Sequence, residues 1–223
     1  MTTWSLWNNR NMVCHGEQGK RHDIIMREAA AYLKEVQEVK QPIERPPVPA
    51  KPPWILPNWG WFKVNTDGAI FEEMGCCGIG VVIRNERGQL MGAMSKKIEL
   101  PLDVLEAEAK ALEEGMLLAW DWGLKEITLE SDSELAVKAL SDQRLLQNSI
   151  QKVIEGIREG LKCFLAMTVT HTRRSGNSPA HILARHAKLL NHSIIWVEDT
   201  PPIIADHIQN DVTGLNSTSF NEI

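Results

Sequence analysis

The chain has 223 residues, of which 43% are hydrophobic and 24% are charged, and its formal net charge is -5 at pH 7. This length accommodates one core of about 100 to 150 residues with extensions, and the composition excludes a largely disordered or membrane-embedded protein. The negative charge argues against a nucleic-acid binder that depends on an overall basic surface. Nucleic-acid binding would therefore depend on local basic patches and on bound cations.

The sequence shows no sign of export or of membrane insertion. No apolar run approaches the ~20 residues of a membrane span, and Met1 to Trp4 lacks a basic region followed by an apolar stretch. The four cysteines are sparse and show no C-x-x-C spacing, which indicates neither a zinc site nor a disulfide framework. We therefore expect a monomeric intracellular protein, in the nucleus or the cytoplasm, without membrane contact.

The first part of the chain is predicted to contain one amphipathic helix and a proline-rich linker. Apolar residues recur near helical spacing between about residues 20 and 40. Seven of the eleven prolines then fall between Pro42 and Pro57, which is typical of a semi-rigid spacer. The expected organisation is an arm with the amphipathic helix at 1–41, the linker at 42–58, a folded domain at 59–190 and a partly disordered C-terminal extension at 191–223.

From Trp61 onward the pattern predicts regular structure. Residues 61–67 alternate in polarity, 78–84 are rich in β-branched residues, and 89–97 follow a turn, so three strands are expected to form an antiparallel meander. The later elements are predicted to be a helix at 104–122, a strand at 127–129, helices at 133–141 and 149–163, a strand at 165–170 and a helix at 178–190. This order predicts an α/β fold with a five-stranded mixed sheet, three antiparallel strands followed by parallel strands, flanked by helices. Beyond Trp196, two prolines break the pattern, and we expect disorder after Asn210.

Three carboxylates lie where these predicted elements meet. Asp67 ends the first strand, Glu108 falls in the first turn of the helix at 104–122, and Asp132 ends the fourth strand. Strand ends at one edge of an open α/β sheet collect into a single site. Three acids there repel one another unless cations intervene, and oxygen ligands suit Mg²⁺ or Mn²⁺. The pattern therefore indicates phosphodiester hydrolysis by two divalent ions about 4 Å apart.

Each acid also has a simpler interpretation. An Asp-Gly pair after a strand is often only a turn, and an aspartate before a helix is often a cap. Glu108 competes with Glu106, Glu113 and Glu114, and a glutamate near a helix start can serve the helix dipole alone. The joint order and placement of the three acids favour a site.

Four segments in order carry a more specific pattern. They are Lys63 to Ala69 around Asp67, Ala107 to Ala119 around Glu108, Glu130 to Ser133 around Asp132, and Asn177 to Ala187. Together they resemble the type 1 ribonuclease H domain, and more narrowly the plant ribonuclease H-like modules related to the C-terminal part of non-LTR retroelement reverse transcriptases. The resemblance covers about residues 59–211. The arm from Trp4 to Asn11 resembles the segment that precedes this module in such polyproteins.

The resemblance implies a ribonuclease H-like fold and cleavage of the RNA strand of an RNA/DNA hybrid, leaving 5′-phosphate and 3′-hydroxyl ends. By motif, Asp67 would bridge two ions, Glu108 and Asp132 would each hold one, and His181 stands at the position of a fourth acid. Glu108 is preferred because its Ala-Glu pair keeps the spacing to Gly115. His171 matches a mobile histidine used for proton transfer or product release, although it can also be a polar residue at a strand end.

Three departures from the family pattern bear on activity. His181 replaces a charged ligand, and an imidazole suits Mn²⁺ better than Mg²⁺. Val104 and Leu105 stand where many members carry amide residues that touch the minor groove, which predicts looser recognition of 2′-hydroxyls. The stretch after Asp132 is too short for the basic handle helix of bacterial relatives. The candidates left for phosphate contact are Lys96, Lys97, Arg173 and Arg174.

Three functions stay open at this point. The chain can be an active or weakly active ribonuclease H. It can instead be a catalytically silent, domesticated module that binds nucleic acid, or a protein partner through the N-terminal helix. A third possibility is a nuclease of another substrate on the same fold, because fold does not fix function.

Overall fold

The computed structural model describes residues 10, 13–15, 18, 20–27, 30–31, 54–141 and 148–218. By internal contacts the chain divides into two units, Met1–Ala50 and Lys51–Ile223. In the first unit, residues 22–27 and 30–31 are helical, within the stretch predicted to form an amphipathic helix. The rest of that helix and most of the proline-rich linker lie outside the described residues.

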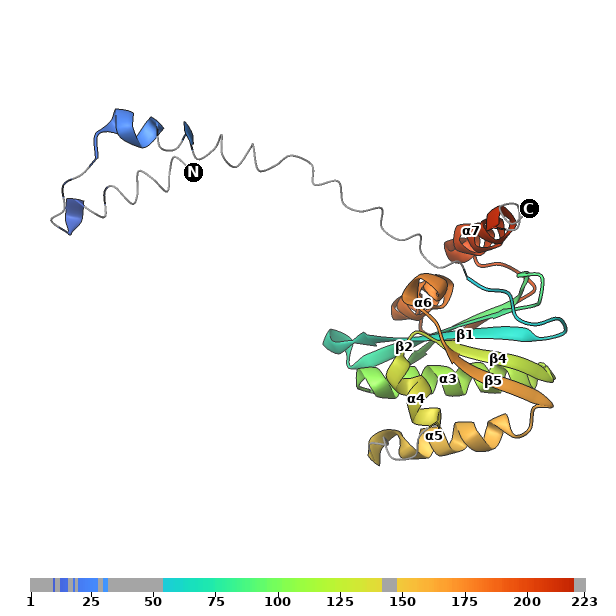
Figure 1. The fold of residues 1–223 in the computed structure, drawn as a ribbon. Helices are drawn as coiled ribbons and strands as arrows, with labels where there is room; N and C mark the ends of the chain where they lie inside the picture. Colours follow the sequence, from blue (N-terminus) through green and yellow to red (C-terminus); the bar gives the residue numbers. More distant parts are fainter. Residues whose placement is uncertain are drawn as a thin grey trace. The chain divides into compact units, whose positions relative to one another are not determined.

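A mixed sheet forms the centre of the second unit (Figure 1). Within the described residues it has six strands in the order β5-β4-β1-β2-β3-β6. Strands β1, β2 and β3 pair antiparallel, as predicted. Strand β4 pairs parallel with β1, and β5 pairs parallel with β4. The bounds are β1 Phe62–Phe71, β2 Cys76–Arg84, β3 Leu90–Ile98, β4 Glu126–Ser131, β5 Ala166–His171 and β6 Ile194–Val197.

Helices cover both faces of the sheet (Figure 1). On one face lie α3, α4 and α5, and on the other lie α6 and α7. The bounds are α3 Val104–Asp121, α4 Glu134–Ser141, α5 Asn148–Leu161, α6 Ser178–His186 and α7 Pro202–Thr218, with short 3-10 turns at Glu72–Met74, Arg174–Gly176 and Ala187–Leu189. No helix among the described residues is long and apolar enough to cross a bilayer.

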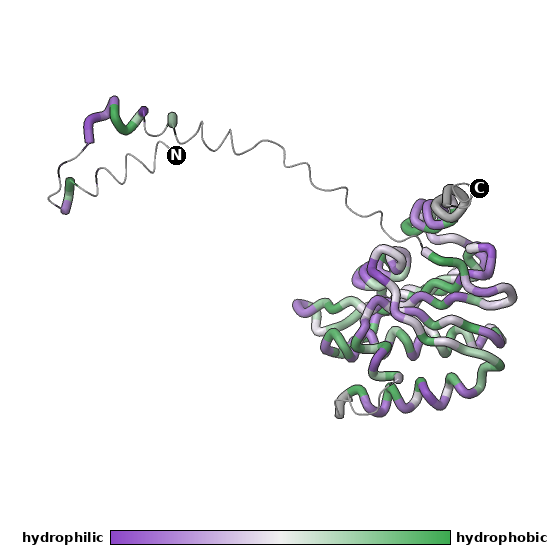
Figure 2. The backbone as a smooth tube through the Cα atoms, viewed as in Figure 1, coloured by the Kyte–Doolittle hydropathy of each residue, from purple (hydrophilic) through white to green (hydrophobic). Residues whose placement is uncertain are grey.

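Two apolar clusters of buried residues hold these layers together. The larger one joins the sheet to α3, α4 and α5 through side chains that include Val64, Leu112 and Ile154. In Figure 2, α5 alternates hydrophobic and hydrophilic segments, as expected of a helix with one apolar face. The smaller cluster joins β2 and β3 to α6 and α7, and its buried members are Val82, Ala93, Ala180, Leu183, Ile204 and Ile208.

The chain continues the fold past residue 190, where we expected a partly disordered extension. The sixth strand, β6, pairs antiparallel with β3 from Ser95 to Gly92. Its four residues are too few to show a clear alternation in sequence. Helix α7 then runs to Thr218. Pro201 and Pro202 precede or open this helix instead of ending the fold, because proline is favoured in the first helical turn.

A buried arginine ties α7 to the sheet. The guanidinium of Arg84 is fully buried, and its Nη1 donates to Asp211 Oδ2 at 2.7 Å. Its Nη2 donates to Asn65 Oδ1 at 2.9 Å, and the guanidinium lies 3.5 Å from the ring centroid of Trp54. Burial lowers the pKa of Arg84 to about 10, so the group stays charged at neutral pH and needs its partner.

Candidate metal centre

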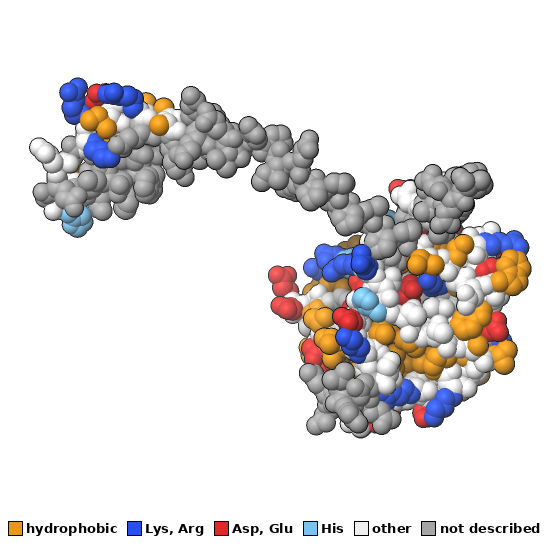
Figure 3. Space-filling model, viewed as in Figure 1, with side chains coloured by type: hydrophobic (Ala, Val, Ile, Leu, Met, Phe, Trp, Pro, Cys, Tyr) orange, Lys and Arg blue, Asp and Glu red, His pale blue; other side chains and the backbone are white. Residues whose placement is uncertain are grey.

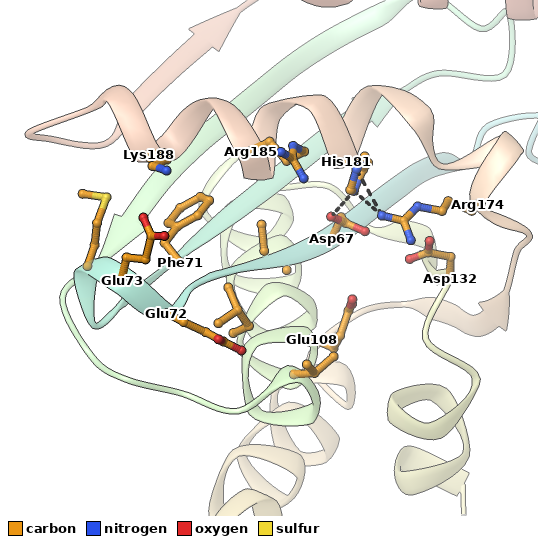
Figure 4. A pocket seen from close by; sticks show the side chains of 15 residues that line it. Asp67, Phe71, Glu72, Glu73, Glu108, Asp132, Arg174, His181, Arg185 and Lys188 are labelled. Atoms are coloured by element: carbon orange, nitrogen blue, oxygen red, sulfur yellow. Dashed lines mark hydrogen bonds and ion pairs between the residues drawn. The ribbon is translucent and has the colours of Figure 1, made fainter. Parts of the chain in front are cut away.

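Three carboxylates converge at one edge of the sheet (Figure 4). One oxygen each of Asp67, Glu108 and Asp132 lies within 4.8 Å of the others. The parallel pairing of β1 and β4 ends at Thr66 and Ser131, so the next residue along the chain after each of them is one of the two aspartates. Asp67 lies within β1, which runs on to Phe71, rather than at the strand end that the sequence predicted.

Glu108 comes from α3, whose first turns pack against β1 directly after Asp67. A Cβ atom on Gly68 would lie 2.7 Å from the carbonyl carbon of Ala107, so only glycine allows this approach. The competing glutamates have other partners. Glu106 forms a capping box with Asp103 at the start of α3. Further along, Glu113 pairs with Lys110, and Glu114 with Lys96.

The three carboxylates lie close together, and burial and mutual repulsion disfavour their charged forms. Asp67 is 3% exposed and Glu108 is 7% exposed, while Asp132 is half-buried. Burial, then the charges of Glu108 and Asp132, raises the pKa of Asp67 to about 9. Burial and the charge of Asp132 raise the pKa of Glu108 to about 7. The three groups therefore disfavour joint ionisation without a cation.

His181 and Arg174 cover the cluster from the other side. His181 Nδ1 lies 3.0 Å from Asp67 Oδ2. The Nη2 atom of Arg174 lies 3.3 Å from His181 Nδ1 and 3.1 Å from Nε2. Burial, then the charges of Arg174 and Arg185, lowers the pKa of His181, which favours the neutral ring.

Helix α6 holds His181 over β1 because it lies unusually close to β2. A Cβ atom on Gly80 would lie 2.0 Å from the carbonyl oxygen of Ala180, so the two backbones are in direct contact. Val82 and Leu183 are fully buried in the cluster between the two elements. The position of His181 relative to Asp67 is therefore fixed by main-chain packing.

Two residues that the sequence did not single out support the carboxylates. The side chain of Asn177, just before α6, is fully buried and donates from Nδ2 to the Thr66 carbonyl at 2.9 Å and to Asp132 Oδ1 at 3.3 Å. Ser131 Oγ donates to Glu108 Oε2 at 3.3 Å. Asn177 was quoted in the sequence only as the first residue of the segment from Asn177 to Ala187 that resembles the family, and no role was assigned to its side chain. Its hydrogen bond to Thr66 joins segments that are far apart in the chain, and residue spacing in the sequence does not reveal such a contact.

Comparison with known proteins settles the family. Residues 65–187 match the family described as reverse transcriptase-like. The chain belongs to this reverse transcriptase-like family. An Arabidopsis thaliana protein whose name marks it as a candidate ribonuclease H is 26% identical over 215 residues, which is 95% of this chain and 34% of the relative. The chain thus spans about a third of the length of that relative.

Solved structures place the reverse transcriptase-like domain on the ribonuclease H fold. Ribonuclease H1 of Halobacterium salinarum superposes with a TM-score of 0.54 at 27% identity, covering 57% of this chain and 97% of that one. The compost-derived LC11 ribonuclease H1, solved in complex with an RNA/DNA hybrid, gives a TM-score of 0.50 at 23% identity, covering 56% and 94%. The predicted resemblance and the predicted fold are therefore confirmed, with six strands in place of five.

The carboxylates of this reverse transcriptase-like domain line one end of a cavity of about 580 Å³. Its wall also carries Arg174, Arg185 and Lys188 from the segment 174–189, opposite Glu72 and Glu73. Figure 4 shows the basic side chains along α6 above the acids. On the face of the second unit that Figure 3 presents, basic side chains gather beside a histidine. Arg185 and Lys188 were not predicted, although they follow His181 at helical spacing.

The other predicted site residues lie elsewhere among the described residues. His171, the last residue of β5, is exposed and lines a separate cavity of about 320 Å³ with Arg173. Lys96 pairs with Glu114 at 2.7 Å, and Lys97 pairs with Glu99 at 2.8 Å. Of the predicted phosphate contacts, Arg174 is therefore the one that the fold brings to the carboxylates.

The donor set fits a hard divalent cation. The cluster offers three carboxylates, two of them buried, and carboxylate oxygen is the ligand type that Mg²⁺ and Mn²⁺ take. A cation would also relieve the repulsion that raises the pKa values of Asp67 and Glu108.

Proposed function

We propose that this chain is a metal-dependent ribonuclease H that hydrolyses the RNA strand of an RNA/DNA hybrid. The observation that carries the proposal is the convergence of Asp67, Glu108 and Asp132 at one edge of a ribonuclease H fold. The name of the Halobacterium relative and the hybrid bound to LC11 ribonuclease H1 support this substrate class. The basic side chains that line the cavity give phosphate groups a place to bind despite the negative net charge.

The carboxylates of Asp67, Glu108 and Asp132 would hold Mg²⁺ or Mn²⁺, with His181 at their edge. A bound ion supplies Lewis-acid polarisation of the phosphate and lowers the pKa of a bound water. The neighbouring residues position these ligands. Asn177 fixes Asp132 against β1, and Ser131 orients Glu108. An imidazole ligand favours Mn²⁺ over Mg²⁺, so the metal preference of the protein reports whether His181 joins the ligands.

The basic residues would bind the substrate backbone. Arg174, Arg185 and Lys188 follow one another along the cavity from the acids towards the turn after α6. Guanidinium groups bind phosphate through paired hydrogen bonds, and such contacts set register rather than sequence preference. A proton-transfer role for His171 stays a prediction, since its side chain lines the other cavity.

A cleavage assay with the purified chain tests this proposal. An RNA/DNA hybrid labelled on the RNA strand should be nicked with Mn²⁺ or Mg²⁺, while EDTA and Asp67→Asn should abolish cleavage. Asp206→Asn removes the same charge from an exposed position on α7 and should leave the rate unchanged. Cleavage that persists in Asp67→Asn, or a preference for single-stranded RNA or DNA, would refute the assignment.

One observation favours the silent module as a second candidate. His181 contacts Asp67, and Arg174 contacts His181, which partly compensates the cluster without an ion. This alternative expects hybrid binding without cleavage in the wild-type chain, and cleavage after His181→Asp. Binding is measured by anisotropy of a labelled hybrid, and cleavage by gel analysis of the same samples. A protein partner for the N-terminal helix stays a prediction.

A further inference from the structure

We propose that this carboxylate cluster holds one divalent ion and that the guanidinium of Arg174 takes the place of a second. The inference deepens the proposed function and rests on it, because it presupposes that the carboxylates bind metal. It departs from the pair of ions that the sequence predicted.

The first argument is that both ring nitrogens of His181 already have contacts within the protein. Both ring nitrogens lie within 3.3 Å of Arg174 Nη2, and Nδ1 also contacts Asp67 Oδ2 at 3.0 Å. An ion bound to either ring nitrogen at about 2.1 Å would lie within about 5 Å of that guanidinium. The guanidinium carries a positive charge, so it would repel an ion at that distance.

The second argument is charge. Asp67, Glu108 and Asp132 together carry three negative charges when ionised, and one divalent ion with Arg174 balances them. A second divalent ion would leave the group with net positive charge, and the nearby Arg185 would add to it. Burial and the neighbouring acids raise the pKa of Asp67 and of Glu108, and the charge of Arg174 partly opposes both rises, so its field reaches both buried acids.

The third argument is the direction in which the turn before α6 points the side chain of Arg174. Arg174 begins the 3-10 turn Arg174–Gly176, and its carbonyl accepts from the backbone N–H of Asn177 at 3.2 Å. In Figure 4 its side chain points between His181 and Asp132. The preceding residue, Arg173, lines the separate cavity instead. Adjacent arginines are thus directed to different sites, and Arg174 is the one that faces the carboxylate cluster.

Counting bound Mn²⁺ tests the inference without relying on activity. Isothermal titration calorimetry of the full chain gives the stoichiometry, and electron paramagnetic resonance detects the spin coupling of two Mn²⁺ ions about 4 Å apart. We expect one uncoupled ion in the wild-type chain and two coupled ions in Arg174→Ala/His181→Asp. The matched control is Arg173→Ala/His181→Asp, which keeps Arg174 and should bind one ion. Arg173 and Arg174 are both exposed, and circular dichroism verifies the fold of each variant.

The outcomes separate this inference from the proposed function. Two coupled ions in the wild-type chain would overturn the role of Arg174 and leave the metal centre standing. One ion in Arg174→Ala/His181→Asp would show that Arg174 does not exclude the second, which also overturns the inference. No bound Mn²⁺ in the wild-type chain would overturn the metal centre itself, and the inference with it.

Discussion

Replacing Asp67 by asparagine is expected to stabilise the metal-free protein. Burial and two neighbouring acids raise the pKa of Asp67 from its ordinary value of 3.8 to about 9. At pH 7 the folded protein therefore holds a proton on this carboxyl, while the unfolded chain has released it. Stability from this group is fully present below pH 3.8 and is lost as the pH rises towards 9.

The magnitude follows from the pH interval. Keeping the proton from pH 3.8 up to pH 7 costs the folded state at most about 4 kcal/mol, at 1.36 kcal/mol per pH unit. An asparagine amide resembles the protonated acid because it offers both a donor and an acceptor, so it can pair with His181 Nδ1 and with Asp132. We therefore expect Asp67→Asn to raise the free energy of unfolding at pH 7 by about 2 to 4 kcal/mol.

Urea denaturation in EDTA measures this change at pH 4, 5.5 and 7. The gain from Asp67→Asn should shrink towards zero at pH 4, where the unfolded chain also holds the proton. Asp206→Asn, on the exposed side of α7, should change stability by less than about 0.5 kcal/mol throughout. A gain that does not grow with pH, or a destabilised Asp67→Asn variant, would refute the electrostatic account of the cluster.

Three further outcomes are expected. Mn²⁺ affinity should rise with pH between 6 and 8.5, because both buried carboxyls must lose protons to bind the ion. The rise should be up to about tenfold per pH unit for each proton released. Titration calorimetry in buffers of different ionisation enthalpy measures the affinity and the number of protons released. Asp211→Ala should cost about 3 kcal/mol in urea denaturation, since it leaves the buried charge of Arg84 without its partner. Gly80→Ala should cost more than about 2 kcal/mol, because its methyl group meets the Ala180 carbonyl oxygen.

A different result would refute each of these three predictions. Affinity that is flat across the pH range would show that the carboxyls are already ionised. Unchanged stability in Asp211→Ala would show that water solvates Arg84. For the glycine, Gly156→Ala is the matched control, because its nearest atom is 3.7 Å away and the position is helical. That control should stabilise the protein by about 0.5 to 1 kcal/mol, and equal effects at both positions would contradict the packing argument.

The strands and the carboxylates were accessible from the sequence because they depend on local pattern. Alternation in Trp61 to Asp67 and the parallel placement of the fourth strand bring two aspartates to the same edge, whichever residues fill the core. Glu108 could be chosen over Glu106 only by resemblance, and the structure adds the physical reason, which is the capping box at Asp103.

The features that the sequence did not reveal depend on contacts between distant segments. The resemblance gave His171 a role in proton transfer or product release, and the structure shows that it ends β5 and lines a separate cavity. The contact of Arg174 with His181 depends on how the turn before α6 is oriented, and that orientation follows from packing against β2. Likewise, β6 is too short to show a clear alternation and is held by long-range pairing with β3. Helix α7 was not predicted although Ile204, Ile208 and Val212 recur at helical spacing, and the ion pair of Arg84 that anchors it joins distant segments.

Helix α7 also shows that similarity and cooperative folding need not share a boundary. The family match ends at residue 187, yet Ile204 and Ile208 complete the apolar cluster under α6, and Asp211 compensates Arg84 in the sheet. A piece cut at residue 187 would keep every carboxylate of the metal centre and lose support for the helix that carries His181. In any transfer of this module to another polypeptide, the unit that has to move intact extends about 30 residues beyond the region that sequence similarity recognises.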